Sequence, residues 1–97
     1  MIQTVVKRDG RIVGFNREKI AAAIRKAMLT TQAGEDDVLV YKIVDRIEFR
    51  GKEQSSVEEI QDMVEVELMA SPRKEVAKSY IAYRDKRSIA RKAKTRE

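Results

Sequence analysis

Residues 4–20 read Thr-Val-Val-Lys-Arg-Asp-Gly-Arg-Ile-Val-Gly-Phe-Asn-Arg-Glu-Lys-Ile, and they predict a β-hairpin that runs directly into a helix. Asp9-Gly10 separates two apolar runs and indicates a two-residue turn, because glycine tolerates the positive φ that a tight turn needs. We expect strands over Thr4–Lys7 and Arg11–Phe15. Asn16 has a side chain suited to cap the helix that follows.

Three cations lie around this expected helix start. Lys7 and Arg8 end the first strand, and Lys19 falls in the first helical turn. A helix N-terminus attracts anions through its free N–H groups and its dipole. A first-turn lysine opposes that dipole, which favours a bound anion as its counterpart. The stretch therefore predicts a polyphosphate site.

Apolar residues at helical spacing predict four helices along the chain. The first covers Arg17 to about Leu29. The second begins at the acidic residues 35–37 and continues to about Phe49. The segment 52–55 is either a loop or a short third strand against the hairpin.

Two further signals indicate where the third and fourth helices begin. Ser55 and Ser56 each have a glutamate three residues on, which is the pattern of a capping box. Pro72 suits the first turn of the fourth helix. We expect residues 91–97, which carry no apolar stripe, to fray or project. The predicted fold is α+β: a four-helix domain capped by a small sheet built on the N-terminal hairpin.

The composition excludes several kinds of chemistry. The 97 residues contain no cysteine and no histidine, so disulfides, thiol catalysis, zinc-ribbon ligation and histidine acid–base catalysis are excluded. No apolar run approaches the roughly 18 residues that span a membrane. No secretory signal precedes the first strand, so we expect a cytoplasmic protein. Nothing resembles a nucleophile–base pair, and we expect no enzyme in this chain alone.

Charge is distributed unevenly. Residues 1–26 carry seven basic and two acidic side chains, residues 27–71 four and eleven, and residues 72–97 ten and three. If the two ends meet, their cations converge on one anionic ligand. The alternative is solvated helix faces, with Arg84 and Arg87 forming surface ion pairs with the acidic third helix. A basic nucleic-acid-binding module and a pure dimerisation module also remain open, although no specific nucleic-acid motif is present.

Three motifs carry a resemblance to a known family. They are Val-Val-Lys-Arg-Asp-Gly-Arg-Ile-Val-Gly-Phe-Asn-Arg-Glu-Lys-Ile at 5–20, Val-Glu-Glu-Ile-Gln-Asp-Met-Val-Glu at 57–65 and Ala-Lys-Ser-Tyr-Ile-Ala-Tyr-Arg-Asp-Lys-Arg at 77–87. In this order and spacing they resemble the ATP-cone domain, the regulatory nucleotide-binding module of many ribonucleotide reductases. The resemblance is greatest to the N-terminal cone of anaerobic, glycyl-radical ribonucleoside-triphosphate reductases. It implies an ATP-cone domain over residues 1–90 and a basic extension over 91–97 leading to a catalytic domain absent here.

The resemblance also implies an effector and its contacts. The effector is ATP or dATP with Mg²⁺ on its phosphates, and it controls overall activity, often through subunit or cone–cone association. Lysine and arginine positions hold the triphosphate, residues at the helix start contact nucleotide and phosphate, apolar residues wall the adenine, and a polar residue lies near the sugar. The triphosphate positions here are Lys7 and Arg8, with Arg87 at the late basic position of the fourth helix. The helix-start positions are Asn16 and Lys19, the adenine walls are Phe15 and Ile20, and the polar residue is Gln61. We add Val6 as a further candidate for the adenine wall and Arg84 as a further candidate among the basic residues.

Two positions depart from the family pattern, and one alternative remains. Val13 stands where some reductases have a glutamate that contacts adenine, and Val57 where some have a threonine near the ribose. The nucleotide-sensing transcriptional repressor of reductase genes also contains a cone. That repressor carries a zinc ribbon ahead of the cone, for which a chain starting at Met1 has no room.

Overall fold

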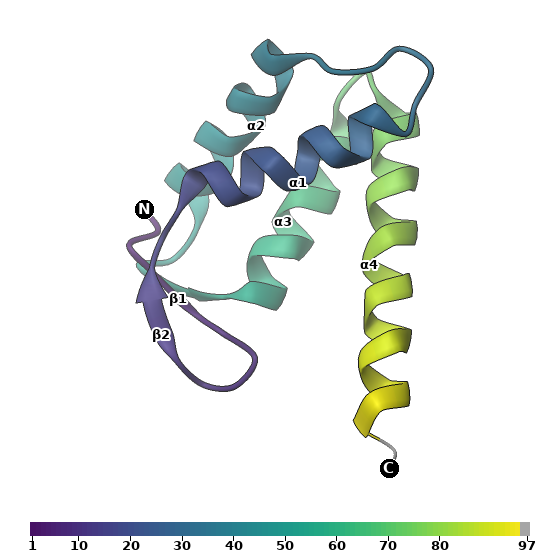
Figure 1. Ribbon diagram of the computed structural model, residues 1–97. Helices are drawn as coiled ribbons and strands as arrows, with labels where there is room; N and C mark the ends of the chain where they lie inside the picture. Colours follow the sequence, from purple (N-terminus) through teal and green to yellow (C-terminus); the bar gives the residue numbers. More distant parts are fainter. Residues whose placement is uncertain (96–97) are drawn as a thin grey trace.

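The computed structural model describes residues 1–95, with side chains described through Arg87. Four helices and three short strands form an α+β domain, as predicted (Figure 1). In chain order the elements are β1 Thr4–Val6, β2 Ile12–Gly14, α1 Arg17–Leu29, α2 Asp37–Arg50, β3 Gln54–Ser56, α3 Val57–Ala70 and α4 Lys74–Thr95. Among the helices described, none is long and apolar enough to cross a membrane.

The three strands pair in the order β2-β1-β3. β1 is antiparallel to β2, with Val5 opposite Val13, and parallel to β3, with Val5 opposite Ser55. The segment after α2 therefore includes the third strand that the sequence left open. β3 leads straight into α3, so this parallel pairing fixes the start of α3 beside the end of β1.

The hairpin turn differs from the predicted two-residue Asp-Gly turn. Its loop is Arg8–Gly10, closed by hydrogen bonds from Gly10 N to Lys7 O (2.9 Å) and from Lys7 N to Arg11 O (2.8 Å). Gly10 has φ +89°, whereas no non-glycine residue in the described chain has positive φ. A two-residue turn of the Asp-Gly kind needs positive φ at both positions, and a three-residue loop needs it only at the last.

The helix starts agree with the sequence signals at three of the four helices. Helix α2 begins at Asp37, directly after Asp36, whose side chain accepts a hydrogen bond from Leu39 N. The Asn16 side chain accepts a hydrogen bond from Glu18 N at α1, and Ser56 forms a reciprocal capping box with Glu59 at α3. Pro72, however, precedes α4 by two residues and is not in its first turn. Helix α4 continues through residues 91–95 without fraying, and residues 96–97 lie outside the described part.

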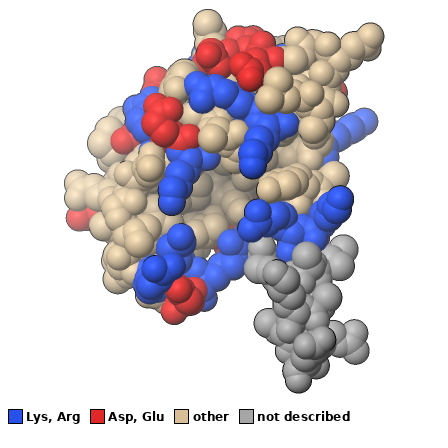
Figure 2. Space-filling model, viewed as in Figure 1, with Lys and Arg blue, Asp and Glu red and all other residues tan. Residues whose placement is uncertain are grey.

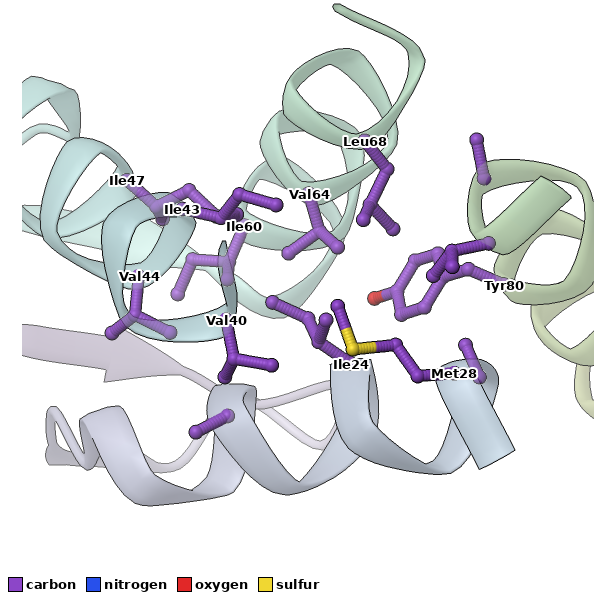
Figure 3. Close-up of a cluster of buried hydrophobic side chains, with 14 of the residues drawn as sticks. Ile24, Met28, Val40, Ile43, Val44, Ile47, Ile60, Val64, Leu68 and Tyr80 are labelled. Atoms are coloured by element: carbon purple, nitrogen blue, oxygen red, sulfur yellow. The ribbon is translucent and has the colours of Figure 1, made fainter. Parts of the chain in front are cut away.

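The core lies where the four helices meet (Figure 3). Helix α1 packs against α2 and α4, and α3 packs against α2 and α4, so each pair shares apolar side chains. The largest fully buried side chains are Ile24, Met28, Val40, Val44, Ile47, Val64, Leu68 and Val76. This core holds the start of α1, the start of α3 and the middle of α4 around one side of the hairpin.

Candidate functional site

A cavity of about 310 Å³ opens between the hairpin, α1, α3 and α4. Figure 2 shows the molecular surface from the same side as Figure 1. This surface is hollowed at its centre, and lysine and arginine side chains gather around the hollow. The cavity walls come from three parts of the chain: the hairpin with α1, the N-terminal part of α3, and one residue of α4. They are Val5, Lys7, Arg8, Val13, Gly14, Phe15, Asn16, Lys19, Ile20, Ala23, Val57, Ile60, Gln61, Val64 and Tyr80.

The deep walls of the cavity are apolar. Phe15 and Ile20 are half-buried where the hairpin meets α1, and Ile60 and Val64 are buried on α3. These side chains belong to, or pack against, the main core. A flat ring can therefore lose its water against them, as in most small-molecule sites, where apolar walls surround a few polar groups.

Two lysines at the cavity have no partner among the described side chains. Lys7 is half-buried at the end of β1, and Lys19 is exposed in the first turn of α1. Neither ammonium group forms an ion pair or hydrogen bond with any side chain that the structure describes. Two uncompensated positive charges beside the N-terminus of α1 attract an anion.

Arg8 also lines the cavity, but its guanidinium already forms hydrogen bonds with side chains of α3. Its guanidinium donates to Glu58 Oε1 (2.9 Å) and to Gln61 Oε1 (3.2 Å), both on α3. The Arg84 hydrogen bond, aided by the charge of Arg8, holds the pKa of Glu58 below its ordinary value. An anion at the cavity thus competes with Glu58 for Arg8.

Arg84 is held by three carboxylates of α3. It donates to Glu58 (2.7 Å), Asp62 (2.8 Å) and Glu65 (3.0 Å). Burial opposes its charge, but these hydrogen bonds outweigh burial and raise the pKa of the guanidinium above its ordinary value. These contacts confirm the alternative interpretation of Arg84, in which it forms ion pairs with the acidic third helix.

Seven of the ten candidate residues line the one cavity: Lys7, Arg8, Phe15, Asn16, Lys19, Ile20 and Gln61. Val6, Arg84 and Arg87 do not. Arg87 is exposed, and its guanidinium donates to the Tyr83 hydroxyl at 3.2 Å. The cations of the two chain ends therefore do not converge on this cavity as expected: α4 contributes Tyr80 to the wall, and neither Arg84 nor Arg87 lines it.

Sequence reasoning did not select several wall residues. Val5, and not the expected Val6, lines the cavity. Successive residues of a strand point to opposite faces, and this alternation was the signal that could have distinguished the two valines. Ala23 and Val64 continue the apolar stripes of their helices, and Tyr80 lies on the inward face of α4. Val13 and Val57, noted above as departures from the family pattern, both line the cavity.

The fold and the site together define a small α+β domain with an apolar cavity that is bordered by two lysines without a described partner. The family model for the ATP cone domain matches residues 3–89, so the chain belongs to the ATP-cone family. An ATP cone is a nucleotide-binding regulatory domain, which confirms the class expected from the three motifs.

Relatives of this chain include three kinds of ribonucleotide reductase. A vitamin B12-dependent ribonucleoside-diphosphate reductase of Thermoplasma acidophilum is 48% identical over 97% of this chain and 13% of its own length. The α subunit of a ribonucleoside-diphosphate reductase from Chlamydia pneumoniae is 37% identical over 99% of this chain and 10% of its own. An anaerobic ribonucleoside-triphosphate reductase of Escherichia coli is 37% identical over 99% and 14%. This chain thus spans only about a tenth to a seventh of these relatives.

Proposed function

We propose that this chain binds ATP or dATP in the cavity between the hairpin, α1, α3 and α4, and that occupancy controls the activity of a ribonucleotide reductase. The observation that carries the proposal is the pair of unpartnered lysines, Lys7 and Lys19, at the mouth of an apolar cavity of about 310 Å³. The adenine lies against Phe15 and Ile20, and the triphosphate faces the two lysines and Arg8.

The energetics support a useful affinity. Charge-assisted contacts from three cations contribute roughly 1.5–3 kcal/mol each. Ordering the ligand costs several kcal/mol, and burial of adenine offsets part of that cost. A micromolar dissociation constant, about −8 kcal/mol, is therefore within reach.

Mg²⁺ accompanies the triphosphate in this proposal. No group of three metal-ligating side chains occurs in the part of the chain that the structure describes. The ion is therefore held mainly by phosphate oxygens and water, the coordination that Mg²⁺ favours with nucleotides.

Discrimination between ATP and dATP rests on one hydroxyl group of the sugar. Gln61 accepts from Arg8 through Oε1, and its amide nitrogen has no partner among the described groups. We assign that amide to the ribose side of the ligand. A buried donor left unpaired by dATP would penalise dATP relative to ATP.

The parent enzyme is proposed to be an anaerobic ribonucleoside-triphosphate reductase in the cytoplasm. The run Tyr80-Ile81-Ala82-Tyr83-Arg84 supports this type. The higher identity to the Thermoplasma relative favours the vitamin B12-dependent type as the second candidate. Reconstitution of the parent enzyme distinguishes them, because a glycyl radical gives an electron paramagnetic resonance signal without added cobalamin.

Titration calorimetry of the 97-residue chain with ATP, dATP and GTP in the presence of Mg²⁺ tests the binding proposal. We expect micromolar binding of both adenine nucleotides and much weaker binding of GTP. If ATP gives no heat and the chain binds DNA or RNA at 0.15 M salt, the nucleotide-binding proposal is wrong and the chain is a nucleic-acid-binding module. Sedimentation with and without dATP tests whether cone–cone association accompanies binding.

A further inference from the structure

Tyr80 is a buried tyrosine whose hydroxyl has no partner among the described groups. Its side chain is only 6% exposed, yet no hydrogen bond to its oxygen occurs in that part of the structure. The other two tyrosines differ, because the Tyr41 hydroxyl contacts Arg25 and Glu18, and the Tyr83 hydroxyl accepts from Arg87. The Tyr80 oxygen is not one of the fully buried side-chain atoms that lack a partner in the described structure, so a ligand or water can reach it.

Tyr80 borders the proposed nucleotide cavity. Tyr80 forms part of its wall, on the α4 side. Figure 3 shows the ring extending from α4, with its oxygen directed toward Ile24 and Val64. Val64 is itself a cavity-wall residue.

Burial and nearby charged groups both affect the Tyr80 hydroxyl. Burial raises the pKa of Tyr80 to about 12, and the charged groups acting on it are Arg84, Glu65, Arg8 and Asp62. Arg8 belongs to the wall of the nucleotide cavity. A second cavity of about 260 Å³, between α1 and α4, also touches Tyr80. The phenol stays protonated at neutral pH and can both donate and accept.

We propose that the Tyr80 hydroxyl is a ligand-contacting group of the site, forming a hydrogen bond with a polar atom of the bound adenine nucleotide on its α4 side. This inference rests on the proposed function and adds to it a contact from the fourth helix. The hydroxyl lacks a protein partner because the ligand supplies one. It also links the ligand directly to the long helix that leads out of the domain.

The test compares Tyr80→Phe with Tyr83→Phe in the 97-residue chain. Both changes remove one phenolic oxygen from α4, and only Tyr80 borders the nucleotide cavity. We expect Tyr80→Phe to weaken binding of ATP, of dATP or of both by about three- to tenfold in calorimetry, the worth of one net hydrogen bond. Loss for ATP alone assigns the contact to the 2′-hydroxyl, and equal loss for both assigns it to a shared atom. Tyr83→Phe should bind like the wild type.

A second measurement needs no variant. With ¹³Cζ-labelled tyrosine, saturating ATP should move the Tyr80 resonance more than those of Tyr41 and Tyr83. Wild-type affinity in Tyr80→Phe, or a Tyr80 resonance that ATP does not move, overturns the inference while the proposed function stands. A wild-type chain that binds no adenine nucleotide overturns both.

Discussion

Replacing Lys7 and Lys19 together by alanine should remove most of the nucleotide affinity without harming the fold. Both side chains border the cavity, and neither has an ion-pair or hydrogen-bond partner among the described side chains. Their removal therefore leaves no carboxylate of the protein unpaired. The double variant should unfold at nearly the wild-type temperature.

The size of the effect follows from the contacts. Each charge-assisted contact with phosphate contributes roughly 1.5–3 kcal/mol, so two contribute about 3–6 kcal/mol if independent. Lys19 is exposed and Lys7 only half-buried, so solvent screening favours the lower end. About 3 kcal/mol corresponds to an increase of roughly 100-fold in the dissociation constant at 0.15 M salt.

The matched control is Lys42→Ala with Lys78→Ala. These lysines are also exposed on helices, form no ion pair with the described side chains and lie away from the cavity. The two double variants have the same net charge. Calorimetry with ATP should show the 100-fold loss only for the Lys7 and Lys19 pair. Equal losses in both would mean that net charge, and not position, draws in the nucleotide, and the assignment of the site would be refuted.

Three predictions concern stability. In Gly51→Ala the new Cβ collides with the buried side chain of Ile2, so we expect urea denaturation to show about 1–3 kcal/mol less stability. Ser56→Ala removes the capping box of α3, and the free energy of unfolding should fall by about 1 kcal/mol; an unchanged value would mean that the cap contributes nothing. Hydrogen bonds from Lys52 and from Ser56 N lower the pKa of Glu59 to about 2, below its ordinary 4.5. This group therefore stabilises the fold above pH 4.5 and loses that contribution as pH falls toward 2, and a melting-temperature series should lose part of its acid slope in Glu59→Gln.

The sequence predicted local structure well where the signal was local. The bounds of α1 agree with the expected Arg17–Leu29, and the Asn16 cap and the capping box are where the side chains indicated. The sequence could not decide whether the segment 52–55 is a loop or a third strand against the hairpin, because β3 pairs with β1, fifty positions away. Pro72 lies outside α4 for a similar reason: Ser71 and Arg73 form tertiary and turn hydrogen bonds that delay the helix start.

Candidate residues of the site were predicted by motif and chemistry, and the structure places most of them at one cavity. The exceptions follow from geometry that periodicity does not specify. Val5 rather than Val6 faces the cavity, since successive strand residues point to opposite faces. The burial of Tyr80 is that of a packing residue. Only the coordinates reveal that its hydroxyl has an open cavity before it and no described partner.

The acidic third helix explains why some cations of this basic chain are free to bind and others are not. Glu58, Asp62 and Glu65 are spaced four and three residues apart, so they lie on one face of α3, and all three hold Arg84. Glu58 also reaches Arg8, which is therefore shared between α3 and the cavity. The lysines on the hairpin and α1 side of the cavity have no such carboxylates within reach among the described residues. The carboxylates of α3 thus neutralise Arg84 and part of Arg8, whereas Lys7 and Lys19 stay uncompensated by the described side chains at the cavity, where a polyphosphate is the matching counter-charge.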